Sequence, residues 1–296
     1  MIRKVSFLLI ICILIIAANN IFAETTPQSI FSSSTVNQVQ IYKDISAVYV
    51  GEWTKYGETF TLLQKNYFKT LYLIILIAIP VAFLLHYLIV GPKEFSHSGE
   101  NIYFFTTLNR VVHWIAAISF LLLATTGIVV IFGKIFGGGS FVRNLRYLHF
   151  ISAVIFTPFA LIMFFMWLKS MLPSSGDITW FLKLGGYLSK KEMIMPVGKF
   201  NPGQKVWFWL GTLGGFVMAF TGYFIYSFQT HVDSLRLYAI VHNVLGIALV
   251  AMFLVHLYMS IFAIKGSLKS MISGYKSEHE VKVMHYKYYT QATGKE

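Results

Sequence analysis

Residues 238–264 read YAIVHNVLGIALVAMFLVHLYMSIFAI and decide the fold. The stretch contains no Asp, Glu, Lys or Arg, and it is long enough to cross roughly 30 Å of hydrocarbon as a helix. It nevertheless carries His242 and His256, and ionisable side chains at this depth are costly and usually functional. The stretch therefore predicts a membrane helix with a task beyond anchoring.

Four other apolar stretches precede it: Leu71–Val90, Val111–Gly133, Leu148–Leu168 and Val206–Phe228. The composition agrees, because 56% of the residues are hydrophobic and only 12% are charged, whereas soluble domains are about a quarter charged. We therefore expect an all-α integral membrane protein with five spans.

The N-terminus has the pattern of a secretory signal peptide over residues 1–23. Arg3 and Lys4 precede an apolar run, and Ile21-Phe22-Ala23 is an acceptable cleavage site; a retained signal anchor is the alternative. The only cysteine, Cys12, lies in this segment. Cleavage would leave no thiol, which excludes disulfides, thiolate-held iron–sulfur clusters and covalent haem attachment.

Orientation follows from the basic residues. If residues 24–70 are periplasmic, the inner segments are residues 91–110, 169–205 and 265–296. These hold fourteen Lys and Arg, against four in the two outer loops and four Lys in the outer N-terminal segment. This bias obeys the positive-inside rule and accounts for much of the net charge of +12. No soluble basic module is visible, so we expect a lipid-embedded protein and no nucleic-acid partner.

Four histidines lie inside or at the ends of the spans: His113, His149, His242 and His256. His242 and His256 are 14 residues apart, which is about 21 Å along a helix, and they face one side of it to within about 40°. Because successive spans run in opposite directions, His113 is level with His256 on the inner side, and His149 is level with His242 on the outer side. His86, in the first span, has no evident partner.

Two imidazoles at one level are what a six-coordinate haem iron requires as axial ligands. The four histidines therefore predict two noncovalent haem b groups, one at each level. One alternative is that each histidine is an interhelical hydrogen-bond donor. Another is a haem-free proton-coupled transporter whose histidines relay protons. Zinc fits less well, because each level offers only two nitrogens and no nearby Asp, Glu or Cys.

A weak repeat relates two helix pairs. Ala124-Thr125-Thr126-Gly127 corresponds to Ala219-Phe220-Thr221-Gly222, 95 positions later, and His149 corresponds to His242, 93 positions later. Small residues let a helix approach a neighbour or a flat ligand closely. A duplicated helix pair would explain both offsets, with chance similarity as the alternative.

The loop before the fourth span reads Gly198-Lys199-Phe200-Asn201-Pro202-Gly203-Gln204-Lys205. It offers amide groups, a glycine and lysines at the expected inner surface, and a quinone needs a hydrogen-bond donor at each carbonyl and a proton path to water. Asn-Pro-Gly is also an ordinary turn, so the loop alone does not decide its role.

Together, four segments resemble the gamma subunit (cytochrome b556) of respiratory formate dehydrogenases. They are this loop, Arg110-Val111-Val112-His113-Trp114, His256-Leu257-Tyr258-Met259 and residues 265–274. The resemblance covers about residues 105–275, and well-known members have four helices. It implies a four-helix di-haem cytochrome b bundle over residues 91–274. The apolar stretch at residues 71–90 is then an extra N-terminal transmembrane helix, and residues 275–296 are expected to be a cytoplasmic tail.

The resemblance also implies the site and the partners. His113 and His256 would ligate a cytoplasm-side haem, His149 and His242 a periplasm-side haem, and the menaquinone site beside His256 would be lined by Asn201, Gly203 and Gln204. An iron–sulfur beta subunit and a molybdenum or tungsten alpha subunit in the periplasm would oxidise formate and deliver the electrons. The chain would thus reduce menaquinone, or another quinone, in the bacterial inner membrane.

Two parts of this expectation have alternatives. The same di-haem arrangement would suit the cytochrome b subunit of a nickel–iron hydrogenase or of another periplasmic oxidoreductase. Residues 24–70 and the first span are not explained by the resemblance. We expect them to dock the periplasmic partner, and the alternative is that they pack on the cytochrome alone.

Overall fold

A computed structural model describes residues 53–96 and 99–295 of the chain. The expected signal peptide and residues 24–52 lie outside the described residues. Five described helices are long and apolar enough to cross a membrane: Lys55–Ile89, Thr107–Ile131, Gly139–Met171, Pro202–Ser227 and Val232–Ala263. The prediction of an all-α membrane protein with five spans is confirmed, and the predicted spans exceed these helices by at most two residues.

Several helices begin well before the apolar stretch that identified them. The third begins at Gly139, nine residues before Leu148, and its added turns carry Arg143 and Arg146. The first is helical from Trp53, so part of the expected periplasmic segment continues the span. Hydrophobicity marks the part of a helix that lies in hydrocarbon, and polar turns beyond it escape that signal.

The described elements run in the following order. The first span comprises η2 (Trp53–Gly57), α3 (Glu58–Leu62), η3 (Leu63–Tyr67) and α4 (Phe68–Ile89). After β1 (Asn101–Tyr103) come α5 (Thr107–Ile131), α6 (Gly139–Trp167), η4 (Leu168–Met171), α7 (Gly176–Leu182) and η5 (Leu184–Gly186). The last two spans are α8 (Pro202–Trp209), η6 (Leu210–Gly214) and α9 (Gly215–Ser227), then α10 (Val232–Tyr258) and η7 (Met259–Ala263). The chain continues with α11 (Ser267–Ser273), β2 (Tyr275–Ser277), α12 (Glu278–Met284) and α13 (Tyr286–Thr293).

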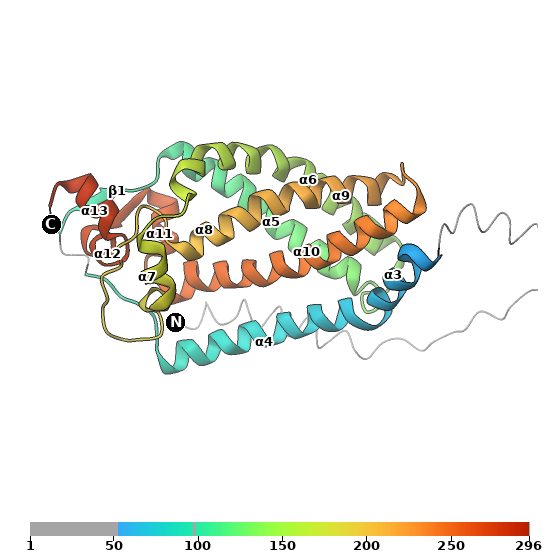
Figure 1. Cartoon of the computed structure of the whole chain (residues 1–296), viewed down its shortest axis with the longest axis horizontal. Coiled ribbons are helices and arrows are strands. Elements are labelled where there is room, and N and C mark those ends of the chain that lie inside the picture. The colour runs from blue at the N-terminus through green and yellow to red at the C-terminus, as the bar shows by residue number, and fades with distance from the viewer. Residues whose placement is uncertain (1–52, 97–98, 296) are drawn as a thin grey trace, which may run out of the picture.

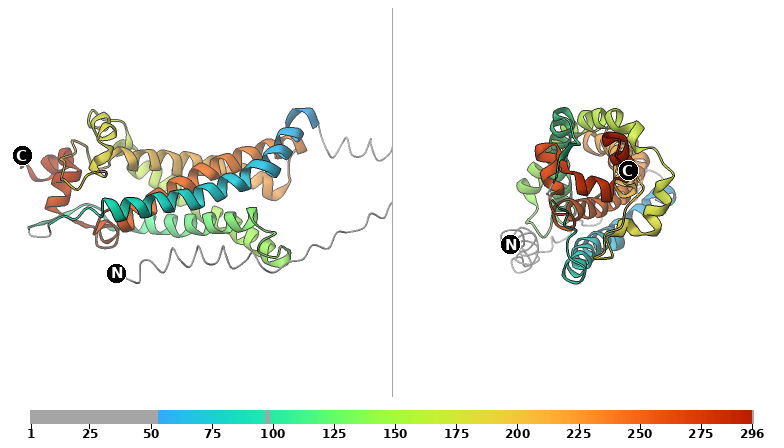
Figure 2. Two further views of the ribbon diagram at one scale, coloured as in Figure 1. Left: turned by 90° about the horizontal axis from the view of Figure 1, so that it is seen from below. Right: turned by 90° about the vertical axis from the view of Figure 1, so that its left-hand side faces the viewer.

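The long helices lie side by side along the longest axis of the molecule (Figure 1). The end that carries α7, α11, α12 and α13 is called the cap end, and the end that carries α3 is called the far end. Viewed toward the cap end, the C-terminal helices cover the end of the bundle, and α4 lies at its periphery (Figure 2). The expected cytoplasmic side corresponds to the cap end.

The extra helix α4 packs on α10. At the cap end His86 Nδ1 lies 2.5 Å from Tyr258 Oη, and the Phe83 ring stacks on the Tyr258 ring with centroids 4.2 Å apart. Nearer the far end Tyr72 Oη donates to the Asn243 carbonyl at 3.4 Å. His86 therefore has the partner that the sequence did not reveal, and α4 is an integral part of the bundle.

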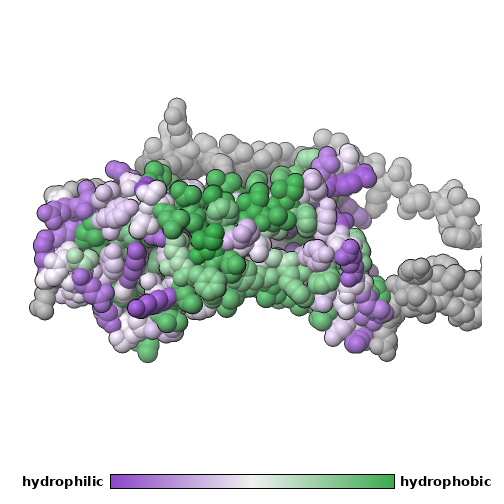
Figure 3. Space-filling model, turned by 90° about the horizontal axis from the view of Figure 1, so that it is seen from above, coloured by the Kyte–Doolittle hydropathy of each residue, from purple (hydrophilic) through white to green (hydrophobic). Residues whose placement is uncertain are grey.

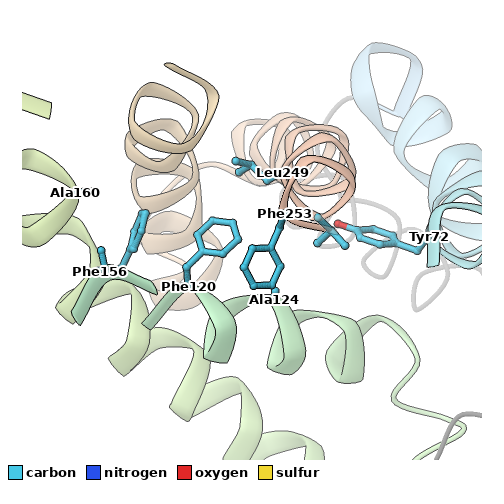
Figure 4. Packing of buried hydrophobic residues seen from close by; sticks show 9 residues of the cluster. Tyr72, Phe120, Ala124, Phe156, Ala160, Leu249 and Phe253 are labelled. Atoms are coloured by element: carbon cyan, nitrogen blue, oxygen red, sulfur yellow. The ribbon is translucent and has the colours of Figure 1, made fainter. Parts of the chain in front are cut away.

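The main core is a cluster of buried aromatic and aliphatic side chains that meet between the long helices (Figure 4). Phe120 from α5 packs edge-on against Phe156 from α6, with ring centroids 5.6 Å apart, and lies 5.0 Å from the Phe253 ring of α10. Tyr72 reaches this cluster from α4. These aromatic contacts join four of the five spans. The core holds the helices, and therefore the histidines, in fixed register.

The C-terminal residues form a folded cap rather than a free tail. β2 pairs with β1 in an antiparallel ribbon, and residues 283–287 exchange backbone hydrogen bonds with residues 195–197. Lys199 Nζ lies 5.4 to 5.7 Å from three aromatic ring centres, those of Phe104, Phe105 and Tyr288. The cap therefore fixes the segment that leads into α8.

The described surface has the polarity of a membrane protein. In Figure 3 hydrophobic residues cover the middle of the visible face, and hydrophilic residues gather at both ends. Many large apolar side chains on the long helices are exposed, such as Leu88 and Ile89 on α4. In a bilayer these side chains would contact lipid.

Candidate functional site

The structure brings the far-end histidines together. His149 lies about three turns into α6, and His242 lies in the first half of α10. Their ring centroids are 6.4 Å apart, with an interplanar angle of 60°. The pairing expected from the sequence register is therefore present in the structure.

A threonine supports each far-end histidine. Thr126 Oγ1 lies 2.9 Å from His149 Nδ1, and Thr221 Oγ1 lies 3.0 Å from His242 Nδ1. Each hydroxyl also contacts the carbonyl one turn earlier, that of Leu122 at 2.5 Å or of Val217 at 2.8 Å. A hydroxyl has one proton to donate and gives it to that carbonyl, so the imidazole must donate from Nδ1. In both histidines Nε2 is left with a free lone pair.

A glycine follows each of these threonines and makes room for the ring. A β-carbon on Gly127 would stand 3.3 Å from His149 Cε1, and one on Gly222 would stand 3.2 Å from His242 Cε1. Both distances are shorter than an ordinary van der Waals contact. The Thr-Gly element of the sequence repeat is thus the support of the histidine in each helix pair.

The cap-end histidines form a second pair. His113 on α5 and His256 on α10 have ring centroids 6.4 Å apart and an interplanar angle of 57°. The Trp207 indole of α8 stacks on His256, with centroids 5.4 Å apart and planes within 20°. His113 Nδ1 is buried without a hydrogen-bond partner, unlike the Nδ1 atoms of the far-end pair.

Both ring separations fit two axial ligands of one metal ion. Imidazole nitrogen binds a metal such as Zn²⁺ at about 2.0 Å; two such bonds, plus the distance from each nitrogen to its ring centre, give roughly 6 Å. The measured value is 6.4 Å at both levels.

Unpaired donors gather at the cap end. Among the described residues, the buried side-chain nitrogens without a partner are Arg110 Nε, His113 Nδ1, Trp167 Nε1 and Trp180 Nε1. All four come from the start of α5, the end of α6 or α7. Because buried donors are rarely left unpaired, an additional group with acceptor atoms fits this end of the bundle.

The expected quinone residues form the N-terminal cap of α8. Asn201 Oδ1 accepts from the Gln204 backbone N–H at 3.0 Å, and Gln204 Oε1 accepts from the Asn201 backbone N–H at 2.9 Å. This reciprocal capping box, with Pro202 at the first helical position, explains much of the motif structurally. The amide oxygens are thus engaged. Asn201 also hydrogen-bonds Tyr187 through its side chain, so one of its two amide N–H donors is in use and the other is left for a further partner.

Two aromatic residues lie against this cap. A β-carbon on Gly203 would stand 3.0 Å from Trp180 Cη2, so the glycine lets the indole lie over the helix start. Burial raises the pKa of the Tyr187 hydroxyl, with a contribution from Glu280, and a hydrogen bond with the Asn201 side chain opposes this shift. The cap of α8 is therefore covered by aromatic side chains and is not an exposed turn.

A buried ion pair lies on another face of α8. Lys205 Nζ contacts Asp177 Oδ2 at 2.7 Å, and Ser174 donates to the same carboxylate through its hydroxyl and its backbone N–H. Burial favours the neutral carboxyl, but these hydrogen bonds outweigh burial and lower the pKa of Asp177. The pair joins α7 to α8.

Residues 104–274 match the family described as prokaryotic cytochrome b561, which is more than half of the chain. The chain belongs to this family. The resemblance predicted from the sequence is confirmed.

Three relatives illustrate the match. The nitrate-inducible formate dehydrogenase cytochrome b556(Fdn) subunit of Escherichia coli K12 is 32% identical over 197 residues, which cover 62% of this chain and 88% of the relative. The cytochrome b556(fdo) subunit of the same strain is 27% identical over 204 residues, covering 65% and 93%. The formate dehydrogenase cytochrome b556 subunit of Haemophilus influenzae is 27% identical over 195 residues, covering 62% and 79%.

Family membership makes this chain a multi-pass membrane cytochrome b that binds haem b. The two imidazole pairs fit that cofactor in ring separation, and the far-end pair also fits in the free Nε2 lone pairs. The part of the chain that the family model matches begins at residue 104. Residues 53–90 lie before that part and are a feature of this cytochrome b in addition to the family's matched region.

Sequence reasoning missed Thr126, Thr221 and Trp207 as residues of the site. The repeat contained the signal for the two threonines, because it paired each Thr-Gly with a histidine at a similar offset. Trp207 gave no signal beyond its aromatic character. The Asn-Pro-Gly-Gln sequence also carried the signature of a helix N-cap, with a capping residue followed three positions later by Gln.

Proposed function

We propose that this cytochrome b is the quinone-reducing membrane subunit of a formate dehydrogenase. It would pass electrons from a periplasmic iron–sulfur subunit through two b haems to menaquinone near the cytoplasmic side. The observation that carries this proposal is that the bundle holds two histidine pairs, one toward each end. The named relatives of the chain are formate dehydrogenase subunits.

The proposed ligands are His149 and His242 for one haem, and His113 and His256 for the other. When bound, a six-coordinate haem supplies reversible one-electron transfer. The chain supplies the free Nε2 atoms at the far end and an apolar, aromatic core between the levels. Arg110 lies on the turn of α5 that carries His113. Its buried Nε would donate to a carboxylate of the group bound at the cap end.

The proposed quinone site lies at the start of α8, beside the cap-end pair. Asn201 and Gln204 would donate amide N–H groups to the quinone carbonyls, and Gly203 would allow close approach. Lys199, which is held by three aromatic rings beside this loop, adds positive charge at the entrance. Burial lowers the pKa of Lys199, which makes its ammonium a better proton donor than an exposed lysine.

The proposed partners are those implied by the relatives: an iron–sulfur beta subunit and a molybdenum or tungsten alpha subunit. We place the chain in the bacterial inner membrane, with its far end periplasmic and its cap end cytoplasmic. The excess of Lys and Arg in the cap-end segments supports this orientation. Signal cleavage after Ala23 would leave residues 24–52 in the periplasm.

The alternatives predict different partners and spectra. A nickel–iron hydrogenase or other periplasmic oxidoreductase could use the same cytochrome, but the relatives named above are formate dehydrogenase subunits. A haem-free transporter is disfavoured, because the family is one of cytochromes.

Purification of the native complex tests the proposal. We expect an iron–sulfur protein and a large catalytic subunit to copurify, and formate but not hydrogen to reduce the haem and then a menaquinone analogue. A complex that is reduced by hydrogen and inert to formate would assign the chain to a hydrogenase instead.

A further inference from the structure

The two histidine pairs have equal ring separations but unequal hydrogen bonding. At the far end both Nδ1 atoms contact threonine hydroxyls, at 2.9 Å for Thr126 and 3.0 Å for Thr221. At the cap end His113 Nδ1 is buried and has no partner. The sequence repeat and the ring geometry would not require this difference, so it needs its own explanation.

The direction of the far-end hydrogen bonds is fixed by the backbone. Each threonine hydroxyl donates its only proton to the carbonyl one turn earlier and can only accept from the imidazole. The imidazole is therefore held with its proton on Nδ1 and its lone pair on Nε2. When the non-ligating nitrogen of an imidazole donates a hydrogen bond, the imidazole also becomes a stronger electron donor to a bound metal.

We propose that Thr126 and Thr221 are positioning residues that orient His149 and His242 for ligation and lower the reduction potential of the far-end haem relative to the cap-end haem. This inference rests on the haem ligation of the proposed function. Stronger donation stabilises the oxidised, more positively charged iron, whereas a cap-end ligand with an unpaired Nδ1 lacks this effect. The difference would favour electron flow from the far end to the cap end.

The glycines after these threonines help to position the same two histidine rings. Gly127 and Gly222 let each ring lie against the neighbouring helix, where a β-carbon would stand 3.3 Å or 3.2 Å from it. The hydroxyl and the bare backbone together define both the distance and the rotation of the ring. The Thr-Gly pair occurs in both α5 and α9, so the two histidines of the far-end pair are supported in the same way.

The test replaces each hydroxyl by a methyl group of the same shape, in Thr126→Val and Thr221→Val. The purified complex is titrated with dithionite while the b-haem absorption is followed, and haem retention is measured against an apo-protein competitor. We expect the potential of one haem to move to a more positive value. That haem should also bind about 10- to 100-fold more weakly, as is typical when the hydrogen-bond partner of a metal-ligating histidine is lost.

Two matched controls separate this role from general packing. Thr125 is exposed and donates to the Leu121 carbonyl, and Thr212 is buried and donates to the Phe208 carbonyl, with no histidine bonded to either hydroxyl. Thr125→Val and Thr212→Val should leave both potentials unchanged. Thr126→Ser, which keeps the hydroxyl, should restore the wild-type potential.

The inference is overturned if the valine variants behave like the two controls, or if the shifted haem is the one that His113→Ala removes. Because dithionite supplies the electrons, a wrong choice between formate and hydrogen as donor would leave the expected shift in place. A wild-type protein without b haem would overturn both this inference and the proposed function.

Discussion

At the scale of single residues, Asn201 combines one observed role with one proposed role. Its side-chain oxygen caps α8, and we propose that its amide N–H group serves the quinone. Asn201→Ala would remove both and cost about 1 kcal/mol in helix capping. A slower reaction in that variant would therefore not distinguish a quinone ligand from a structural cap.

Asn201→Ser separates the two. Serine caps helices about as well as asparagine but has no amide donor. We expect near wild-type thermal stability, normal haem reduction by the electron donor, and quinone reduction slowed about tenfold, which corresponds to the loss of one hydrogen bond of about 1.4 kcal/mol. Stopped-flow absorption follows both steps. Unchanged quinone turnover in Asn201→Ser would leave the residue with capping alone.

How much of the site could be predicted depends on the geometry each residue needs. The level of a membrane histidine follows from its position along a helix, so the pairs could be predicted from the sequence. The partners of Nδ1 could not, because the direction of Thr126 toward His149 depends on how α5 and α6 cross. Trp207 stacks on His256 for the same kind of reason, across the contact of α8 and α10.

At the scale of elements, the apolar spans were predictable and the cap was not. Hydrocarbon thickness sets the length of an apolar run, which is why the five spans emerge from composition. The cap is built from short, mostly polar helices that are stabilised by contacts with residues 195–199, far away in the sequence. Such contacts leave no periodic pattern, so the sequence suggested a tail.

The cap should be weakened by acid. His285 is buried and donates from Nδ1 to the Gly198 carbonyl at 3.1 Å; burial, with a smaller contribution from Lys276, lowers its pKa to about 3. In the unfolded segment the histidine has a pKa of about 6.5 and is protonated below that pH, whereas His285 in the folded cap stays neutral. Stability is therefore full above about pH 6.5 and falls as the pH drops toward about 3.

Hydrogen exchange of residues 275–295 in detergent measures this effect. We expect exchange to accelerate between pH 7 and pH 5 beyond its intrinsic pH dependence, with α4 and α10 unaffected. His285→Asn keeps a donor for the Gly198 carbonyl but cannot titrate, so it should remove the pH dependence. The explanation is wrong if the asparagine variant loosens with acid as much as the wild type.

At the scale of the whole molecule, α4 is fixed to the cytochrome by its contacts with α10. This arrangement agrees with the view that the first span packs on the bundle, and it leaves a docking role to the segment before it. Because the helix already begins at residue 53, removal of residues 24–52 should leave the bundle intact. We expect the truncated protein to keep its haem and to release the iron–sulfur subunit on washing. A complex that stays whole through detergent purification would exclude that docking role.

Haem stoichiometry tests the central claim most directly. The pyridine haemochrome of the purified chain, measured against total protein, should give two haem b per chain in the wild type. His113→Ala and His256→Ala should each reduce this to one and remove the same spectral component, and His149→Ala and His242→Ala should each remove the other. Two haems retained in any of these variants, or different components lost within one pair, would contradict the assignment of the four histidines.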